Sequence, residues 1–484
     1  MNGPIRRIAF GTFVCLFALL VGVTWYQVVR ADALRDDPRN PRPALAERGK
    51  ERGLIVTRDG TVVARSVEDP EDPRSFVREY PEGEAFAHLV GYSSFILLDA
   101  TALEDAYSSE LRSRRDLTIS DIVAALLGRD LRPQSLEITA DAALQKAALE
   151  ALGANRGAVV ALDPATGAVL ASVSTPSFDP EGLIGDDAAE VWETLLAADG
   201  EPIRDRATQE LYAPGSTFKT VVAAAALDTG AAMPGTTFPD PAEFDLPGSE
   251  ATISNANDQP CNDGESATLL QAFVRSCNTI FADLAIQLGA VDIGITAEAL
   301  GFNQEIEYEW PIPEAVWDTP TLAEDPAALG QSGIGERDVR VTPLHMAMVA
   351  AAVANDGVAV SPFSVRRTFD ADGGTVEEHE ISELGRAMMS ETAQTLTQLM
   401  ERVVTEGTGR RAAVPGVRVA GKTGTATGQD DLSNPWFIGF APVDNPTIAL
   451  AVFIEGSPAS GESASGGSLA APIAAQLFEV WLGT

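Results

Sequence analysis

The sequence predicts a mixed α/β fold, in which an antiparallel five-stranded sheet is covered by helices and adjoins an all-helical subdomain. Three observations predict this fold. Two apolar strand patterns occupy residues 157–174, three more occupy residues 417–455, and helical patterns fill much of the chain between them. Short connections within each group favour antiparallel pairing. We expect a small irregular spacer domain and one transmembrane helix to precede this part of the chain.

The composition indicates a globular protein with an acidic surface. The 484 residues suffice for two or three domains, and 45% of them are hydrophobic. The net charge of −36 argues against nucleic acid as a partner, because phosphate binding requires a basic face. Only four of the 34 basic residues are lysines, so the chain uses arginine for nearly every plain positive charge.

The N-terminal segment is predicted to anchor the chain in a membrane. Residues 8–29 contain no charged side chain, and a helix of this length can span a bilayer. Arg6 and Arg7 precede the segment, which places residues 1–7 in the cytoplasm and the rest of the chain outside. A cleaved signal peptide is the alternative, with Ala31 to Ala33 as a loose cleavage site. We favour an uncleaved single-pass anchor, because the apolar run exceeds a signal peptide's hydrophobic region.

Residues 30–135 read as the spacer domain. They begin with a Pro- and Arg-rich linker and continue with an alternating apolar pattern around Asp59-Gly60, which predicts a hairpin with a two-residue turn. One helical stretch is expected near Ile122–Leu127. The rest of this segment consists of short, charged and irregular stretches, so we expect no second enzyme domain here.

Residues 136–484 read as the main domain. A helix is expected over Thr139–Leu152, followed by the first two strands. Residues 216–228 form an apolar helix that ends at Gly230. After the last three strands, Ala471–Leu482 reads as a closing helix with proline in its first turn.

A serine and a lysine at the start of residues 216–228 are the first candidate catalytic pair. Ser216 and Lys219 are spaced i, i+3, so their side chains share a helix face and can approach each other. A hydroxyl becomes a good nucleophile when a base removes its proton, and a lysine can be that base only when its amine is neutral. Arginine cannot be deprotonated, so a chain that prefers arginine retains lysine here for a reason. Alone, S-x-x-K is a weak signal.

Two further motifs follow in order. Ser276 and Asn278 lie between two helical stretches, where a hydroxyl could relay a proton and an amide could hold the base. By itself this tripeptide is a weak signal, and helix capping is the favoured explanation for it. Lys422-Thr423-Gly424-Thr425 lies in a strand pattern, where the amine and hydroxyls could hold a carboxylate and Gly424 could let substrate backbone approach. An edge strand is the plain alternative.

The cysteines and histidines indicate neither a metal site nor a cofactor. Cys261 and Cys277 lie 16 positions apart, with no spacing typical of zinc ligands. Outside the membrane they could form a disulfide or remain two buried thiols, and the sequence leaves both open.

With these three motifs in this order, the chain resembles the class B, monofunctional penicillin-binding proteins, in particular the short actinobacterial type. S-x-x-K, S-x-N and K-T-G together mark penicillin-binding proteins and class A β-lactamases. Cys277 stands where S-D-N has Asp, which argues against the β-lactamases. The resemblance covers nearly the whole chain and is carried further by RATQELYAPGSTFK, QSGIGERDVRVTPLHMAMVAAAVANDG and GKTGTA.

The resemblance implies a fold and a reaction. The fold is the penicillin-binding transpeptidase and serine β-lactamase-like one, with a dimerisation-type spacer domain. Ser216 would attack a D-Ala-D-Ala stem peptide of peptidoglycan, with Lys219 as general base. Ser276 would relay the proton and Asn278 would position Lys219 and substrate. The acyl group would pass to the amine of a neighbouring stem, and β-lactams would acylate the same serine.

The resemblance also assigns the remaining binding groups. Lys422, Thr423 and Thr425 would bind the terminal carboxylate, and the backbone N–H groups of Ser216 and Thr425 would form the oxyanion hole. It implies a polytopic glycosyltransferase and division proteins as partners. The alternatives are a D,D-carboxypeptidase or β-lactamase-like hydrolase, and a non-catalytic sensor or division scaffold. The spacer is too short for the glycosyltransferase domain of a bifunctional protein.

Overall fold

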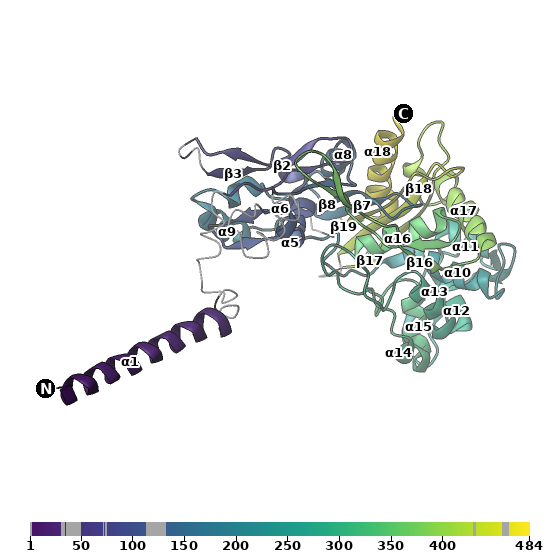
Figure 1. The fold of residues 1–484 in the computed structure, drawn as a ribbon. Coiled ribbons are helices and arrows are strands. Elements are labelled where there is room, and N and C mark those ends of the chain that lie inside the picture. Colours follow the sequence, from purple (N-terminus) through teal and green to yellow (C-terminus); the bar gives the residue numbers. More distant parts are fainter. Residues whose placement is uncertain are drawn as a thin grey trace.

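A five-stranded antiparallel sheet lies at the centre of the C-terminal half of the molecule (Figure 1). The computed structural model describes residues 2–30, 34, 50–70, 72, 75–112, 132–428, 432–456 and 464–484. The strand order β17-β18-β19-β7-β8 brings the two ends of the domain together. This sheet confirms the predicted fold class, number of strands and antiparallel pairing. Its strands are β7 (Gly157–Leu162), β8 (Val169–Thr175), β17 (Ala420–Thr427), β18 (Ser433–Ala441) and β19 (Ile448–Ile454).

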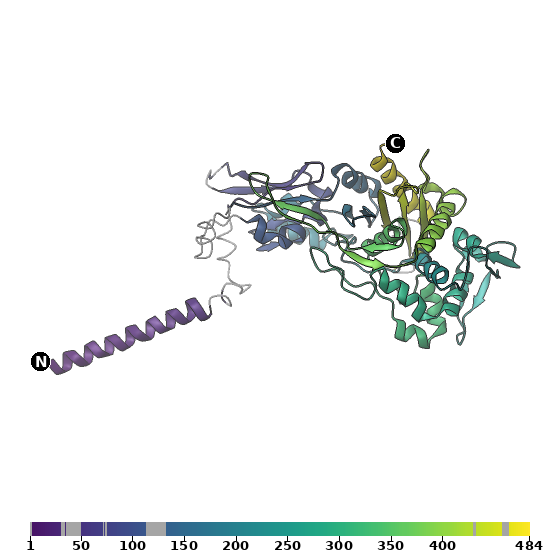
Figure 2. The same ribbon diagram turned by 45° about the vertical axis from the view of Figure 1, so that its right-hand side comes forward.

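Helices cover both faces of this sheet, which explains why its strands read as apolar runs. Alternate residues of a strand face opposite sides, and in β19 Ala451 packs into one core while Val452 packs into the other. The helices that flank the two faces lie on opposite sides of the sheet (Figures 1 and 2). The flanking helices are α8 (Ala142–Leu152) and α18 (Ala471–Leu482) on one side, and α16 (Pro343–Ala354) and α17 (Ser390–Thr405) on the other.

A mainly helical subdomain extends from the second face, with two small two-stranded sheets within residues 237–268. Its helices begin at strong capping signals: Thr268 and Gln271 form a reciprocal capping box at the start of α11, and Asp325 caps α15. The helices match the predicted all-helical subdomain, to which the two small sheets are an addition. Its helices are α10 (Lys219–Asp228), α11 (Leu269–Arg275), α12 (Asn278–Leu288), α13 (Ala290–Ala299), α14 (Thr319–Glu324) and α15 (Pro326–Gly333).

The N-terminal half contains a second, six-stranded sheet of order β15-β14-β6-β1-β2-β3. The expected boundary between residues 135 and 136 falls inside β6, and residues 365–378 supply two of the strands. The pair β1 and β6 is parallel, unlike the neighbours in the first sheet. The strands are β1 (Ile55–Val56), β2 (Val62–Glu68), β3 (Phe76–Glu79), β6 (Ser135–Ile138), β14 (Val365–Phe369) and β15 (Thr375–Glu378).

The predicted hairpin forms between β1 and β2, but its turn is longer than two residues. Thr57 N donates to Thr61 O at 2.9 Å, so three residues lie between the closing pair. The turn is held by its own side chains: Thr57 Oγ1 donates to Asp59 Oδ1, and Thr61 N donates back to Thr57 Oγ1 at 3.0 Å. The helical stretch expected near Ile122–Leu127 lies outside the described residues.

Short helices complete the packing around the second sheet. Four of them pack with its core, and the other strands of the described residues form four two-stranded sheets. The short helices are α4 (Ala87–Val90), α5 (Ala102–Ala106), α6 (Ser108–Leu111) and α9 (Ala188–Ala197). The remaining strands are β4 (Ser93–Ser94), β5 (Asp99–Ala100), β9 (Thr237–Pro239), β10 (Glu243–Asp245), β11 (Thr252–Ser254), β12 (Ser266–Thr268), β13 (Val358–Val360) and β16 (Glu383–Arg386).

The N-terminal apolar segment is one long helix. The helix α1 (Asn2–Thr24) continues as a π-helical turn, Trp25–Val29. Gly3–Val29 is long and apolar enough to cross a membrane, and none of its most apolar stretch is buried. The helix is therefore compatible with the expected membrane anchor.

Candidate active site

Ser216 lies where a short 3₁₀-helix, η4 (Gly215–Phe218), leads into α10. The 3₁₀-helix packs directly against the edge strand β17, and two glycines permit this contact. A side chain at Gly215, which has φ +53°, would meet Thr425 O at 2.7 Å. A side chain at Gly424 would meet Pro214 O at 2.9 Å. Gly424 therefore accommodates the chain's own backbone, whereas the sequence suggested a place for substrate backbone.

Lys219 links the S-x-x-K motif to the S-x-N segment. Its side chain is 0% exposed, and Nζ donates to Ser276 O at 2.8 Å and to Asn278 Oδ1 at 2.7 Å. The sequence predicted that Nζ would approach Ser216 Oγ, but in this structure the amine is bonded to the S-x-N segment instead. A neutral amine has two N–H donors and one lone pair. Because both short contacts are to acceptors, they use the two donors and leave the lone pair free to take a proton.

The S-x-N segment is shaped to present these acceptors. Ser276 ends α11 in the left-handed conformation, with φ +63° and ψ +45°. Side chains other than glycine rarely adopt this conformation, and such strain concentrates at functional sites. Asn278 then begins α12, and its Nδ2 donates to Ser254 O at 2.9 Å, which directs Oδ1 toward Lys219.

Lys422 approaches the same serine from the sheet. Its side chain is also 0% exposed, and Nζ donates to Ser276 Oγ at 2.8 Å and to Thr423 O at 2.8 Å. The Ser276 hydroxyl is therefore bonded to one lysine and lies 3.5 Å from the other. The three sequence motifs, separated by up to about 200 positions, meet around this hydroxyl.

Burial, and for Lys219 the charge of the other lysine, favour the neutral forms of these two lysine side chains. Burial, and then the positive charge of Lys422, hold the pKa of Lys219 well below its usual range, although Glu336 opposes the shift. Burial lowers the pKa of Lys422 to about 7. Aromatic rings supply part of this burial. The ring centroid of Phe281 lies 5.6 Å from Lys219 Nζ, and that of Phe273 lies 5.7 Å from Lys422 Nζ.

The rest of the K-T-G segment forms the free edge of the sheet. Gly428 N donates across to Leu432 O, while Thr427 N donates to Glu336. Alternate residues of a strand direct their N–H groups the same way, so Thr425 and Pro435, which lie opposite each other on β17 and β18, are not a hydrogen-bonded pair. The Thr425 N–H therefore points away from β18, toward the edge against which η4 packs. The Thr425 side chain is exposed, whereas Thr423 is 5% exposed and its hydroxyl bonds to that of Thr408.

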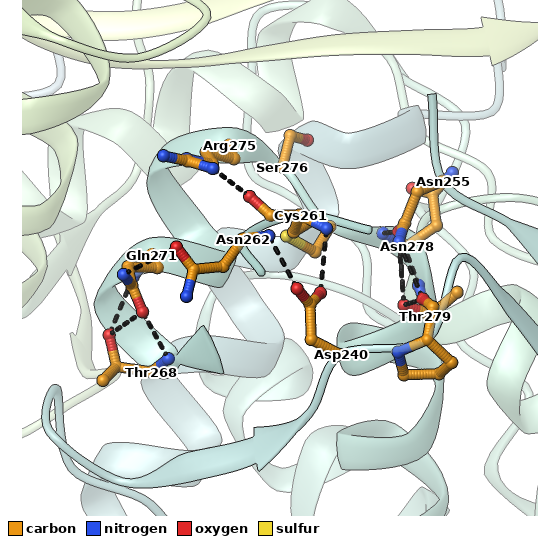
Figure 3. The surroundings of a disulfide bond; sticks show 12 residues. Asp240, Asn255, Cys261, Asn262, Thr268, Gln271, Arg275, Ser276, Asn278 and Thr279 are labelled. Carbon is orange, nitrogen blue, oxygen red and sulfur yellow. Dashed lines mark hydrogen bonds between the residues drawn. A yellow bond between two sulfur atoms is a disulfide. The ribbon is translucent and has the colours of Figure 1, made fainter. Parts of the chain in front are cut away.

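A disulfide joins Cys277 of the S-x-N segment to Cys261 (Figure 3). The Cys261 end is itself held, because Asp240 accepts from Cys261 N at 2.8 Å and from Asn262 N at 2.6 Å. Arg275 Nη1 also donates to Cys261 O. The backbone between Ser276 and Asn278 is therefore attached to the loop that precedes α11.

Sequence analysis missed three residues that support the site. Asn255 is 5% exposed and its Oδ1 accepts from Asn278 N at 2.8 Å, so it holds the start of α12 (Figure 3). Asp240 anchors the disulfide loop, and Glu336 accepts from Thr427 N at 3.0 Å. No local signal marks these residues, because their roles depend on contacts with distant segments. Among the described residues, no group of His, Cys, Asp and Glu side chains is arranged to hold a metal ion.

Comparison with known families matches both halves of the chain. Residues 157–479 match the penicillin binding protein transpeptidase domain, and residues 52–136 match the penicillin binding protein A dimerisation domain. The peptidoglycan D,D-transpeptidase PbpA of Mycolicibacterium smegmatis is 39% identical over 98% of this chain and 97% of its own length. PbpA of Mycobacterium tuberculosis is 38% identical over 100% of this chain and 99% of its own length.

The fold also matches a solved structure. Penicillin-binding protein A of M. tuberculosis, in its ceftriaxone acyl-enzyme complex, superposes with a TM-score of 0.83 at 35% identity. The match covers 90% of this chain and 99% of the other. The similarity therefore extends across both sheets.

Proposed function

Because this chain belongs to the penicillin-binding protein transpeptidase family and is a serine-type peptidoglycan D,D-transpeptidase, we propose that Ser216 is its nucleophile and Lys219 its general base. The observation that carries this proposal is the hydrogen bonding of Lys219. Its amine is buried, depressed in pKa and bonded to two acceptors, which leaves its lone pair free to take a proton.

The proposed acylation proceeds in two parts. Ser216 Oγ attacks the carbonyl carbon of the D-Ala-D-Ala bond while its proton passes to Lys219. The N–H groups of Ser216 and Thr425 stabilise the resulting oxyanion, which is consistent with the outward direction of the Thr425 N–H. The C–N bond then breaks, and Ser276 relays a proton to the departing D-Ala amine.

The second half of the reaction resolves the acyl-enzyme. An amine of a neighbouring stem peptide attacks the ester carbonyl and gives up a proton to Lys219. The C–O bond to Ser216 then breaks, and Lys219 returns a proton to the departing Ser216 oxygen. We propose that Asn278 positions Lys219 and substrate. Lys422, Thr423 and Thr425 hold the terminal carboxylate of the donor. Because Lys422 bonds to Ser276 Oγ, this carboxylate site adjoins the proton relay.

The cellular arrangement is part of the proposal. The apolar helix anchors residues 8–29 in the cell membrane, residues 1–7 form a cytoplasmic tail, and the remainder lies on the outer side. Residues 30–135 act as the spacer and residues 136–484 carry the chemistry. A polytopic glycosyltransferase and division proteins are the proposed partners. The positive-inside pattern of Arg6 and Arg7 supports this orientation.

Covalent labelling by fluorescent penicillin tests the proposal. The full-length chain in detergent micelles should label and release the drug slowly, and Ser216→Ala should not label. A matched control is Ser332→Ala, which removes a buried serine on α15. Equal labelling of wild type and Ser216→Ala would refute the assignment of the nucleophile, and rapid release would indicate a β-lactamase.

A further inference from the structure

The carboxylate of Glu336 lies at the free edge of β17, close to the candidate active site. Thr427 N donates to Glu336 Oε1 at 3.0 Å. Alternate N–H groups of a strand point the same way, so Thr427 and Thr425 direct theirs toward the same edge. Two residues of a strand span about 7 Å, which places this carboxylate about that far along the edge from the proposed oxyanion hole.

The segment that carries Glu336 is fastened to the segment that carries Ser216. Gly215 N donates to Gly335 O at 2.9 Å, and a side chain at Gly335 would meet Gly215 O at 1.9 Å. Tyr212 and Val341 exchange two backbone hydrogen bonds further along. The position of the Glu336 carboxylate is therefore set by the same contacts that place the nucleophile.

Glu336 forms none of the ion pairs found among the described residues. The neighbouring Arg337 pairs with Asp325 and Asp338, and Arg340 donates to the backbone carbonyls of Arg337 and Val339. Burial raises the pKa of Glu336 to about 7, although the Thr427 N–H and the charges of Arg340 and Lys219 oppose the rise. A carboxylate with one N–H donor and no paired cation retains capacity for a cationic ligand.

The reaction itself supplies such a cation. The acyl acceptor is an amine of a neighbouring stem peptide, and donor and acceptor stems belong to the same polymer, so an uncross-linked donor stem carries that amine too. With its terminal carboxylate at Lys422 and its reacting carbonyl at Thr425, the donor's upstream residues run toward Thr427. An extended peptide that adds to a sheet edge places alternate side chains about 7 Å apart, which matches the distance from Thr425 to Thr427.

We propose that Glu336 is a specificity-determining residue that binds the side-chain ammonium group of the acyl-donor stem peptide, upstream of D-Ala-D-Ala. This inference rests on the proposed function and names the donor chemistry that the same site prefers. The carboxylate selects donors in which the amine is still free, so a stem whose amine has already been acylated becomes a poorer donor.

Two synthetic donors test the proposal. Both end in L-Lys-D-Ala-D-Ala, one with a free lysine side-chain amine and one with that amine acetylated. D-Ala release by the full-length chain in detergent should favour the free amine by roughly fivefold in kcat/KM, the size expected for a partly exposed ion pair. Equal kcat/KM for the two donors in wild type would overturn the inference and leave the proposed function standing.

Variants identify the residue responsible. Glu336→Gln retains an acceptor for the Thr427 N–H but loses the charge, so its donor preference should disappear. Asp338→Asn removes one negative charge from the same segment and should retain the preference. Fluorescent penicillin, which lacks the lysine ammonium, checks that each variant still holds Ser216 and Lys219 in place.

Three further outcomes decide the remaining cases. If Glu336→Gln does not fold, Glu336→Lys should instead favour a donor with L-Glu in place of L-Lys, and failure of that reversal counts against the inference. A full preference in folded Glu336→Gln overturns it. Absence of both D-Ala release and penicillin labelling in wild type would overturn the proposed function, and this inference with it.

Discussion

Two regions of the molecule bury ionisable side chains. One region favours the ionised form of its side chain, and the other favours the neutral form. In the N-terminal half, Glu104 is 0% exposed and lies between two arginines. Arg78 Nε donates to Oε1 at 2.6 Å and Arg52 Nη2 donates to Oε2 at 2.6 Å. Tyr80 Oη adds a further hydrogen bond at 3.1 Å. Every bond of this group favours the ionised carboxylate.

In the catalytic half, Lys219 and Lys422 are equally buried but have no carboxylate partner within ion-pair distance among the described residues. Their bonds go to neutral oxygens. Burial alone raises the pKa of Glu104, but Arg78 and Arg52 more than offset it and leave the pKa below its ordinary value. Burial lowers the pKa of both lysines. A buried charge with counter-ions is held in one state, whereas a buried amine with neutral partners can exchange a proton.

The largest expected effect comes from Lys219→Arg. Arginine retains a positive charge but cannot be deprotonated, so the proposed base is lost. Acylation by fluorescent penicillin should slow by roughly 1,000-fold, within the range for loss of a general base. A variant that acylates within tenfold of wild type would show that Lys219 serves only as a charge.

The second prediction concerns stability rather than activity. Glu104→Ala leaves Arg78 buried without its counter-charge, which should reduce the free energy of unfolding by about 3–5 kcal/mol, measured by denaturant titration. Since the Glu104 pKa is lowered in the folded state, its stabilisation is present above the ordinary glutamate pKa and lost as the pH falls through the folded value.

Penicillin acylation by the fraction of Glu104→Ala that remains folded should proceed near the wild-type rate. A loss of acylation in folded protein would contradict the separation of the two regions. Glu79→Ala is a suitable control, since its partner Arg65 is exposed.

The third prediction uses the two lysine pKa shifts. Protonation of Lys219 should abolish D-Ala release in acid, and loss of the Lys422 charge should lower kcat/KM as the pH rises through about 7. Lys422→Arg remains charged, so its alkaline fall should be absent even though its activity is lower. The acetylated donor should be used for this profile, because its lack of an upstream ammonium removes any contribution of Glu336.

The smallest expected effect is that of Asn255→Ala. This change removes the acceptor for Asn278 N and Thr279 N at the start of α12. By analogy with the loss of a helix cap, the free energy of unfolding should fall by about 1–2 kcal/mol. Acylation should also slow, because Asn278 is proposed to position the base, and Asn255→Asp should restore much of both. Unchanged acylation would show that α12 holds Asn278 without this support.

Much of the catalytic half could be predicted from the sequence. The closing helix Ala471–Leu482 has the predicted bounds, and the five strands lie where the apolar patterns placed them. These elements are local: periodicity, caps and short turns define them. The second sheet could not be predicted, because β14 pairs with β6 across more than 200 positions and neither strand carries a signal of its partner.

The candidate site divides in the same way. The sequence by itself indicated which residues to propose for the chemistry, because Ser216, Lys219, Ser276 and Lys422 lie in short motifs whose residue types the proposed reaction requires. Only the tertiary structure decided that Lys219 bonds to the S-x-N segment, that a disulfide holds this segment, and that Asn255 and Glu336 lie beside it. Burial, proton affinity and contacts between distant segments are properties of the packed chain, and no local pattern encodes them.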